Sequence, residues 1–519
     1  MILSGTGPLA AVFWGLSQPS LHWPILKNYR QKIKQNSQRQ KQLLTQNNEE
    51  EIMEQPYNFA PKEELELIHA HSLRLLKETG VVFYCDEALE VFKKHGARVD
   101  GETVFIEERM LNEALKTIPK TYEWYGREGS ITLGGGKPIY ASSYGPMYVY
   151  EDDDYHFPTP LDFANFAKLD QSSRVVTIGN PNNMDMPQIK PEERSNYAMA
   201  ATLMYLDKPL MGMVDGKKSA TDCLNMVRRF YGMDDSDKRC VVSGLINVAS
   251  PFHYSQAMCE GLMKYASEGQ ATFVTSAGMS GLTVPDTLAG HILVANTEIL
   301  AGVVLTQLIN PGVPVVYGLQ GLGSDLRYTV GTMGSPEQSL IFQTAKALAN
   351  FYGMPVRTGG LMNDAKDMDI QAGVESFNSG YAAIMSGVDV MLLSCGMLDS
   401  VNTISYDKYI YDEEMIQSIE RFVRGYEVTE ETLQLDKIQK AGPGGDFLGR
   451  TTRLYRRDYF MPEICNRLSH GNWIAAGKPT VKSRTKAAYQ KRLEEYVMPE
   501  MDKDQKALIE KYIPKEHWY

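Results

Sequence analysis

The middle of the chain reads TFVTS (residues 272–276), then PDTLAGHILVANTEILAGVVLTQL (285–308), then PVVY (314–317). The first and third stretches are short and rich in β-branched residues, which favour strands, whereas the long apolar segment between them favours a buried helix. A helix that joins two strands is typical of a parallel sheet, because a parallel pair needs a long crossover connection. The sequence therefore predicts a β/α unit at the centre of the chain.

The same alternation extends in both directions and predicts eight units. The predicted strands are Ile139–Ser143, Val175–Ile178, Leu210–Val214, Cys240–Asn247, Thr272–Ser276, Pro314–Tyr317, Pro355–Thr358 and Val388–Ser394. The predicted helices are Leu161–Gln171, Pro191–Tyr205, Lys218–Tyr231, His253–Ser267, Pro285–Leu308, Pro336–Phe351, Asp369–Met385 and Asp412–Phe422. Eight β/α units predict an α/β fold of the (β/α)8 TIM barrel type over residues 139–441. A doubly wound open sheet is the alternative, because the pattern does not show whether the strand order reverses.

Three flanking segments complete the predicted organisation. Residues 53–138 predict a small N-terminal α+β lead-in, and residues 442–519 predict a helical C-terminal cap. Residues 1–52 differ in composition, with an apolar Gly/Pro segment before a run rich in Gln, Lys and Asn. No positive charge precedes the apolar part, which argues against a signal peptide. The purine-rich codons implied by Glu49–Glu51, just before Met53, favour a translated leader; a disordered tail is the alternative.

The charge balance excludes two classes of partner. The chain carries 53 Lys and Arg residues against 64 Asp and Glu residues, a net charge of −11. Such a chain has no basic field to hold nucleic acid or an anionic membrane. The apolar stretch Pro285–Ile309 contains Asp286, His291 and Glu298, which a membrane span rarely tolerates. The sequence therefore predicts neither a nucleic-acid partner nor a membrane association.

The positions of the cysteines and lysines limit the types of reaction that the protein could catalyse. The six cysteines are scattered without CxxC or Cys/His spacing, which fits reduced thiols in a cytoplasmic protein rather than a disulfide framework or a structural metal site. No His, Asp and Glu residues stand at metal-ligand spacing, and no predicted strand contains a lysine for a Schiff base. We therefore expect a reaction that uses no metal and no nucleophilic side chain.

The loops after the strands should carry the functional residues of such a barrel. Polar residues follow several predicted strands, among them Asp185, Asp215 and Asn247. Glycines crowd the later loops, where they would let something large and flat approach the backbone. The predicted mouth consists of Gly278, Gly281, Gly321, Gly359, Gly360 and Gly396.

Four motifs in these loops together resemble the trimethylamine methyltransferase family. They are TSAGMSGLTVP (275–285), NPGVPVVYG (310–318), SDLR followed by GSPE (324–337), and GGLMNDAKDMDIQAGVES (359–376). The chain resembles in particular the members without pyrrolysine, which demethylate quaternary amines such as glycine betaine, proline betaine or carnitine. The resemblance implies a barrel that moves a methyl group to the Co(I) of a separate corrinoid protein. That partner presents the cobalamin, and no cofactor is bound by the chain itself. Trimethylamine-specific members carry pyrrolysine in the barrel, whereas this sequence contains only the ordinary twenty residues. The resemblance therefore favours a quaternary amine, with trimethylamine as the alternative substrate.

The residues agree with this chemistry, because a quaternary ammonium already has a neutral amine as its leaving group. The protein then needs only to orient, desolvate and hold the cation, for which aromatic faces and carboxylates are suited. The expected cage consists of Tyr144, Phe252, Tyr254 and Tyr317, with Asp185 beside it. Asp325, Glu337 and Asp364 are the expected catalytic carboxylates, and Arg327 and Arg357 would bind a carboxylate on the substrate.

Two other functions remain open on the sequence. Methyl transfer of this kind asks for few chemical groups, so the barrel could be a catalytically silent paralogue that binds a betaine for regulation. It could also be a metal-assisted hydrolase or lyase whose ligands are distant in the sequence. In each case the chain could form a homo-oligomer.

Overall fold

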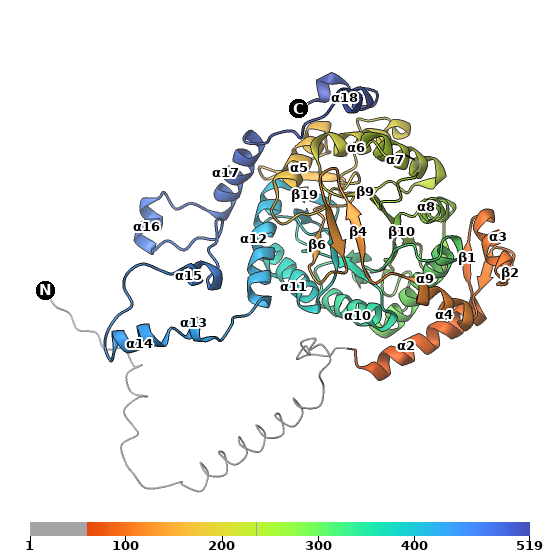
Figure 1. Cartoon of the computed structure of the whole chain (residues 1–519), viewed down its shortest axis with the longest axis horizontal. Helices are drawn as coiled ribbons and strands as arrows, with labels where there is room; N and C mark the ends of the chain where they lie inside the picture. The colour runs from red at the N-terminus through yellow and green to blue at the C-terminus, as the bar shows by residue number, and fades with distance from the viewer. Residues whose placement is uncertain (1–59, 235) are drawn as a thin grey trace, which may run out of the picture. The chain divides into compact units, whose positions relative to one another are not determined.

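The computed structural model describes residues 60–234 and 236–519. The prediction of a leader over residues 1–52 lies outside these residues. The described chain is a mixed α/β structure whose centre is a parallel sheet enclosed by helices (Figure 1).

The central sheet has seven strands, all parallel to their neighbours, in the order β6-β17-β16-β13-β12-β10-β9. The strands are β6 (Ile139–Tyr140), β9 (Leu210–Gly212), β10 (Val242–Val248), β12 (Ala271–Ser276), β13 (Val315–Leu319), β16 (Val356–Gly359) and β17 (Val390–Leu392). They correspond to seven of the eight predicted strands. The sheet curls round, as in a fold of the TIM-barrel type (Figure 1).

The predicted second strand, Val175–Ile178, is not a strand but a short hydrogen-bonded segment between the two edges of the sheet. The N–H of Thr177 donates to Tyr140 O at 2.9 Å, and the N–H of Gly179 donates to Pro209 O at 2.9 Å. The ammonium of Lys208 donates a hydrogen bond to the carbonyl oxygen of Val176 at 2.6 Å, so this oxygen is not available to a neighbouring strand. Because the Lys208 ammonium competes with a neighbouring strand for this carbonyl, the segment pairs with the sheet only at the single residue pair Gly179 and Leu210.

Helices surround the sheet near the predicted positions, but the last of them starts at Tyr406, after the capping side chain of Ser405, and not at the predicted Asp412. They are α5 (Pro160–Ser172), α6 (Pro191–Tyr205), α7 (Gly216–Phe230), α8 (Gln256–Ser267), α9 (Leu288–Ile309), α10 (Pro336–Tyr352), α11 (Ile370–Ser386) and α12 (Tyr406–Val423). Local signals set their ends: the Thr159 side chain caps α5, and Gly353 and Gly387 end α10 and α11 in the left-handed region. Among the described helices only α9 is long and apolar enough to cross a bilayer, and 83% of its apolar window is buried in the molecule.

Two predicted helices start three residues later than expected. Helix α9 begins at Leu288, after the Thr287 side chain that caps it, and not at Pro285. The other is α8. Residues His253–Tyr254 form strand β11, which pairs in parallel with β1 (Val81–Phe83) of the N-terminal region. Helix α8 therefore begins at Gln256, after the Ser255 side chain that caps it.

The N-terminal region, from residue 60 onward, combines helices and strands. Its elements are α2 (Lys62–Arg74), η1 (Leu75–Thr79), β1, α3 (Asp86–Lys94), β2 (Arg98–Asp100), β3 (Thr103–Phe105), α4 (Glu108–Thr117), β4 (Tyr122–Tyr125) and β5 (Ser130–Leu133). The β4–β5 hairpin reaches the central sheet, where Trp124 packs edge-on against Phe273 of β12 and the hydroxyls of Tyr122 and Ser243 lie 3.2 Å apart. This hairpin covers the amino-terminal end of the sheet's interior, and Figure 1 shows β4 within the ring of helices.

Two small sheets, which the sequence did not predict, occupy the loops after the strands. They are β14 (Gly323–Asp325) with β15 (Val330–Thr332), and a four-stranded sheet of β7 (Tyr148–Glu151), β8 (Asp154–His156), β18 (Met397–Leu398) and β19 (Thr403–Ser405). The C-terminal region contains α13 (Glu430–Leu433), α14 (Leu435–Ala441), α15 (Arg453–Asp458), α16 (His470–Ala475), α17 (Val481–Glu494), α18 (Lys503–Ile509) and η2 (Lys515–His517). Tyr489 of α17 stacks on Tyr406 of α12 at 5.1 Å between ring centroids, which fixes this region to the helices around the sheet.

A buried polar hub joins the N-terminal region to the sheet. Asn296 of α9 donates through Nδ2 to Ser72 Oγ and to the Tyr352 hydroxyl, each at 2.9 Å, and accepts from the Tyr317 hydroxyl at 2.9 Å. Burying these groups is favourable only because each has a partner.

The substitution Tyr317→Phe should therefore lower the free energy of unfolding by about 1–3 kcal/mol, because it leaves the Asn296 carbonyl oxygen buried without a donor. Tyr328→Phe is the matched control, since that side chain is 73% exposed. Urea unfolding of both variants measures the difference. Equal stability of the two variants would show that the hub does not hold the sheet.

A buried ion pair within α12 forms hydrogen bonds to the loop after β17 and to α11. The Lys408 ammonium contacts the Asp412 carboxylate and donates to Ser376 Oγ at 2.9 Å. Asp412 also accepts from the N–H of Gly396 at 2.9 Å, and burial raises the pKa of its carboxyl to about 6.

The substitution Lys408→Met should destabilise the fold by about 3–5 kcal/mol, because it leaves the Asp412 carboxylate buried and unpaired. Lys486→Met removes an exposed pair with Asp152 and should cost no more than about 1 kcal/mol. The measurement is denaturant unfolding near neutral pH. A loss for Lys408→Met as small as that of the control would contradict the prediction.

Candidate functional site

The outer contacts of the strands identify which side chains face the helices. The hydroxyl of Tyr317 bonds Asn296 of α9, the Ser276 hydroxyl donates to Glu298 of α9 at 2.6 Å, and the Tyr140 hydroxyl donates to Glu420 of α12 at 2.7 Å. Successive side chains of a strand point to opposite faces. The residues next to these in the strands therefore face the interior of the curled sheet.

One row of the interior, called the polar row here, contains the polar side chains of Asn247, Thr275 and Arg357. Residues in register across the strands are Asn247, Thr275, Gly318, Arg357, Val390 and Ile139. The row below it is apolar and contains Leu245, Phe273 and Val316. The polar groups are thus concentrated toward the carboxyl end of the sheet, above a layer that the β4–β5 hairpin covers.

Arg357 is the charged side chain of this row. It is only 3% exposed, and its Nε and Nη1 atoms have no hydrogen-bond partner. Burial lowers the pKa of its guanidinium to about 10. Its neighbour in register is Gly318, where an added Cβ would collide with the Thr275 side chain. The position opposite the guanidinium thus carries no side chain of its own.

Tyr144 and Asp215 complete the polar end of the interior. Tyr144 lies in the loop after β6, and Asp215 lies between β9 and α7. Burial and the Asp215 carboxylate both raise the pKa of the Tyr144 hydroxyl, whereas Arg357 acts in the opposite direction. The Tyr144 ring is therefore within electrostatic reach of one anion and one cation. A site with this composition can hold a small molecule that carries both charges.

The predicted catalytic carboxylates lie outside this interior. Asp364 accepts from the N–H groups of Met333 and Gly334 and from the Ser400 hydroxyl, so it fixes the strand β15 to the loop after β16. Glu337 is exposed in the first turn of α10. The structure thus gives Asp364 a role in joining loops and leaves Glu337 at the surface.

The predicted Asp185, Asp325 and Arg327 are already paired. Asp185 contacts the Arg194 guanidinium at 2.6 Å. Asp325 and Arg327 form an exposed pair at 2.6 Å where β14 ends. The structure does not bring these residues to the polar row, and we leave them out of the proposed site.

Three of the four predicted cage aromatics also lie elsewhere. Tyr254 is buried, donates to Glu298 O at 2.7 Å and stacks on Phe83 of the N-terminal region at 4.7 Å. Tyr317 faces α9, as described above. Phe252 lies in the loop after β10, with its N–H bound to the Glu298 carboxylate at 2.8 Å. Of the predicted cage only Tyr144 reaches Arg357.

The six predicted mouth glycines have local reasons to be glycine. Gly281, Gly321 and Gly396 have positive φ, which other residues rarely adopt. An added Cβ at Gly278 would collide with Val284, and one at Gly359 with Met362. At Gly360 it would lie 2.5 Å from the Cα of Ser394. Their part in admitting a corrin ring stays a prediction, because backbone conformation and close packing together account for them.

Glu298 is a residue of the site region that the sequence did not single out. Its buried carboxylate accepts from Ser276 Oγ at 2.6 Å, Ser250 Oγ at 2.9 Å and the N–H of Phe252, while burial raises the pKa of the carboxyl. It ties the loop after β10 to the end of β12. A charged residue on an otherwise apolar helix was the available signal.

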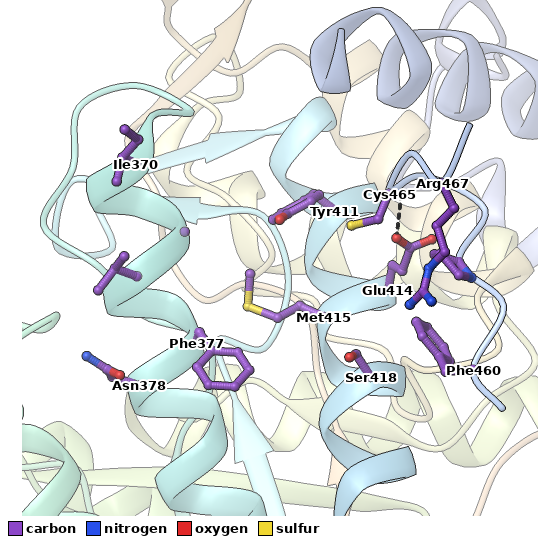
Figure 2. Close-up of a pocket in the computed structure, with 13 residues that line it drawn as sticks. Ile370, Phe377, Asn378, Tyr411, Glu414, Met415, Ser418, Phe460, Cys465 and Arg467 are labelled. Carbon is purple, nitrogen blue, oxygen red and sulfur yellow. Dashed lines mark hydrogen bonds between the residues drawn. The ribbon is translucent and has the colours of Figure 1, made fainter. Parts of the chain in front are cut away.

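A separate pocket of about 430 Å³ lies outside the sheet, between α11, α12 and residues 460–467 (Figure 2). Its carboxylate, Glu414, already accepts the N–H groups of Glu463 and Ile464 at 2.6 Å and of Cys465 at 2.7 Å. Figure 2 shows Phe377, Met415 and Phe460 around the opening. No predicted site residue lines this pocket, and its carboxylate is already occupied by three backbone N–H groups.

Within residues 60–234 and 236–519, no three His, Cys, Asp or Glu side chains are grouped so that they could hold a metal ion. The expectation of a reaction without metal stays a prediction.

The comparisons with known proteins agree with the sequence motifs. The model of the trimethylamine methyltransferase (MTTB) family matches residues 28–517. The glycine betaine methyltransferase of Desulfitobacterium hafniense is 34% identical over 88% of this chain and 96% of its own length. Two proteins of Eubacterium limosum, a proline betaine:corrinoid methyltransferase and an L-carnitine:corrinoid methyltransferase, are each 35% identical over 88% of this chain and 97% of theirs. The chain therefore belongs to the trimethylamine methyltransferase family and is a corrinoid methyltransferase.

Proposed function

We propose that this protein transfers one methyl group from a betaine-type quaternary amine, such as glycine betaine, proline betaine or carnitine, to the Co(I) of a corrinoid on a separate protein. The observation that carries the proposal is the polar end of the sheet's interior, where the buried Arg357 has unpaired nitrogens and Tyr144 lies within electrostatic reach of both Arg357 and Asp215. The activities of the relatives with about 35% identity support the same substrate class.

In this proposal the chain's own residues bind and orient the amine. The Asp215 carboxylate and the face of the Tyr144 ring attract the quaternary ammonium. The apolar row below, with Phe273 and Val316, excludes water from the inner end of the site. The substrate is then held with little freedom to rotate, which lowers the entropic part of the barrier.

The methyl transfer requires few other groups from the protein. The corrinoid supplies the Co(I) nucleophile, the carbon–nitrogen bond breaks, and its electron pair stays on nitrogen as a neutral tertiary amine. No proton is required by this balance. The cobalamin belongs to the partner in this proposal, and both proteins act in the cytoplasm. We also infer that residues 177–179 close the sheet into a ring of eight β/α units, supported by their hydrogen bonds to both edges.

Incubation of the full chain with Co(I)-cobalamin and a panel of amines tests the proposal. We expect one betaine to be converted into its tertiary amine and the reaction to stop there, because the tertiary product is a poorer methyl donor. Mass spectrometry of the amines measures each step. Binding without conversion would favour the silent paralogue, consumption of trimethylamine would favour the alternative substrate, and continued demethylation at a comparable rate would refute the mechanism.

Removing the charge at Asp215 tests the cation site. Asp215→Asn should weaken binding of the active betaine about tenfold, or ~1.4 kcal/mol, because the ammonium loses its anionic neighbour. Asp222→Asn is the control, since Asp222 pairs with Lys218 on the surface of α7. Calorimetric titration measures both affinities. Unchanged affinity in Asp215→Asn would remove this residue from the site.

A further inference from the structure

The unpaired guanidinium of Arg357 is unusual for a folded protein. The side chain is 3% exposed and forms no ion pair within residues 60–234 and 236–519, and its Nε and Nη1 atoms have no acceptor. A buried charge without a partner lowers stability, and natural structures retain one where it has another use. The interior position of Arg357 points to a ligand as the missing partner.

We propose that Arg357 is the residue that selects the substrate, by binding the carboxylate of a quaternary ammonium carboxylate inside the sheet. This inference rests on the function proposed above and adds which end of the substrate is recognised and by which residue. The planar guanidinium matches a carboxylate with two parallel hydrogen bonds, and burial strengthens such a pair. Choline and tetramethylammonium lack this group and would leave Arg357 unpaired.

The depth of the charged groups fixes the orientation of the substrate. Arg357 is buried, whereas Asp215 and Asn247 at the same end of the interior are exposed. A zwitterion that satisfies both charges lies with its carboxylate inward and its ammonium outward. The methyl groups then point to the open end, where a partner protein can approach them. Arg357 therefore positions the reacting methyl without touching it.

Binding experiments with three probes separate the two charges of the substrate. Glycine betaine carries both, choline carries only the ammonium, and tert-butylacetate is the carbon isostere of glycine betaine with only the carboxylate. We expect Arg357→Met to weaken glycine betaine and tert-butylacetate by about 100-fold and to change choline by less than about threefold. Calorimetry of the full chain measures all three affinities.

Two further variants keep the test decisive. Arg109→Met removes an exposed arginine paired with Glu113 and should change none of the affinities. Arg357→Lys keeps the charge but not the two-pronged geometry, so its affinity for glycine betaine should lie between those of the wild type and Arg357→Met. If Arg357→Met does not fold, Arg357→Lys is used for the test in its place. The melting temperature of Arg357→Met without ligand should equal or exceed that of the wild type, because an unpaired buried charge is removed.

The outcomes distinguish this inference from the proposed function. If the wild type demethylates a betaine and the folded Arg357 variants still prefer betaine to choline, the inference is wrong and the function stands. If tert-butylacetate binds through Arg357 but no amine is demethylated, the function is wrong and the carboxylate site stands. A wild type that binds choline as tightly as betaine would also overturn the inference.

Discussion

The alternation of side chains along the parallel strands is the constraint on which the site depends. Tyr317 and Gly318 are consecutive, yet the first bonds Asn296 of α9 and the second faces the interior in register with Arg357. In the same way Ser276 reaches Glu298 on the outside while Thr275 faces inward. The outward residues attach the helices, and the inward ones form the polar row. A shift of one residue in register would exchange the two sets, so the packing of the helices also fixes the chemistry of the interior.

The outer and inner polar groups differ in whether they are satisfied. Asn296, Glu298 and Asp412 each accept or donate several hydrogen bonds within the chain, which is how buried polar groups contribute to stability. Arg357 does not, although it is just as deeply buried. Other arginines with a buried, unpaired nitrogen, such as Arg127 and Arg228, have a partner at another nitrogen, namely the Leu206 carbonyl and the Glu268 carboxylate. Among the described residues, the Arg357 guanidinium has no such partner and is therefore a point of low stability. Function at the cost of stability is the usual reason for such a point.

Much of the fold followed from the sequence, because hydrophobic period and turn residues act locally. Seven strands and the helices around them were predicted, while Val175–Ile178 was not, since the competing bond from Lys208 comes from a distant segment. The residues of the site were harder to predict than the fold. Tyr144 and Arg357 were selected, but Tyr254, Asp364 and the glycines were chosen by residue type at strand ends. Applying the two-residue alternation inside each strand would have separated Tyr317 from Gly318, and it would have favoured Asn247, which is the last inward residue of its strand.

In the proposed binding mode, the reaction weakens the interaction between the protein and one end of the substrate, the end that carries the ammonium. The quaternary ammonium is positive whatever the pH, so Asp215 and Tyr144 attract it until the carbon–nitrogen bond breaks. The amine that results is neutral at that moment and loses this attraction, whereas its carboxylate still faces Arg357. Attachment by one charge is weaker than attachment by two, and an amine held only at its inner end is free to rotate its remaining methyl groups away from the open end. The arrangement of charges therefore favours a single transfer followed by release, with no catalytic side chain needed to enforce it.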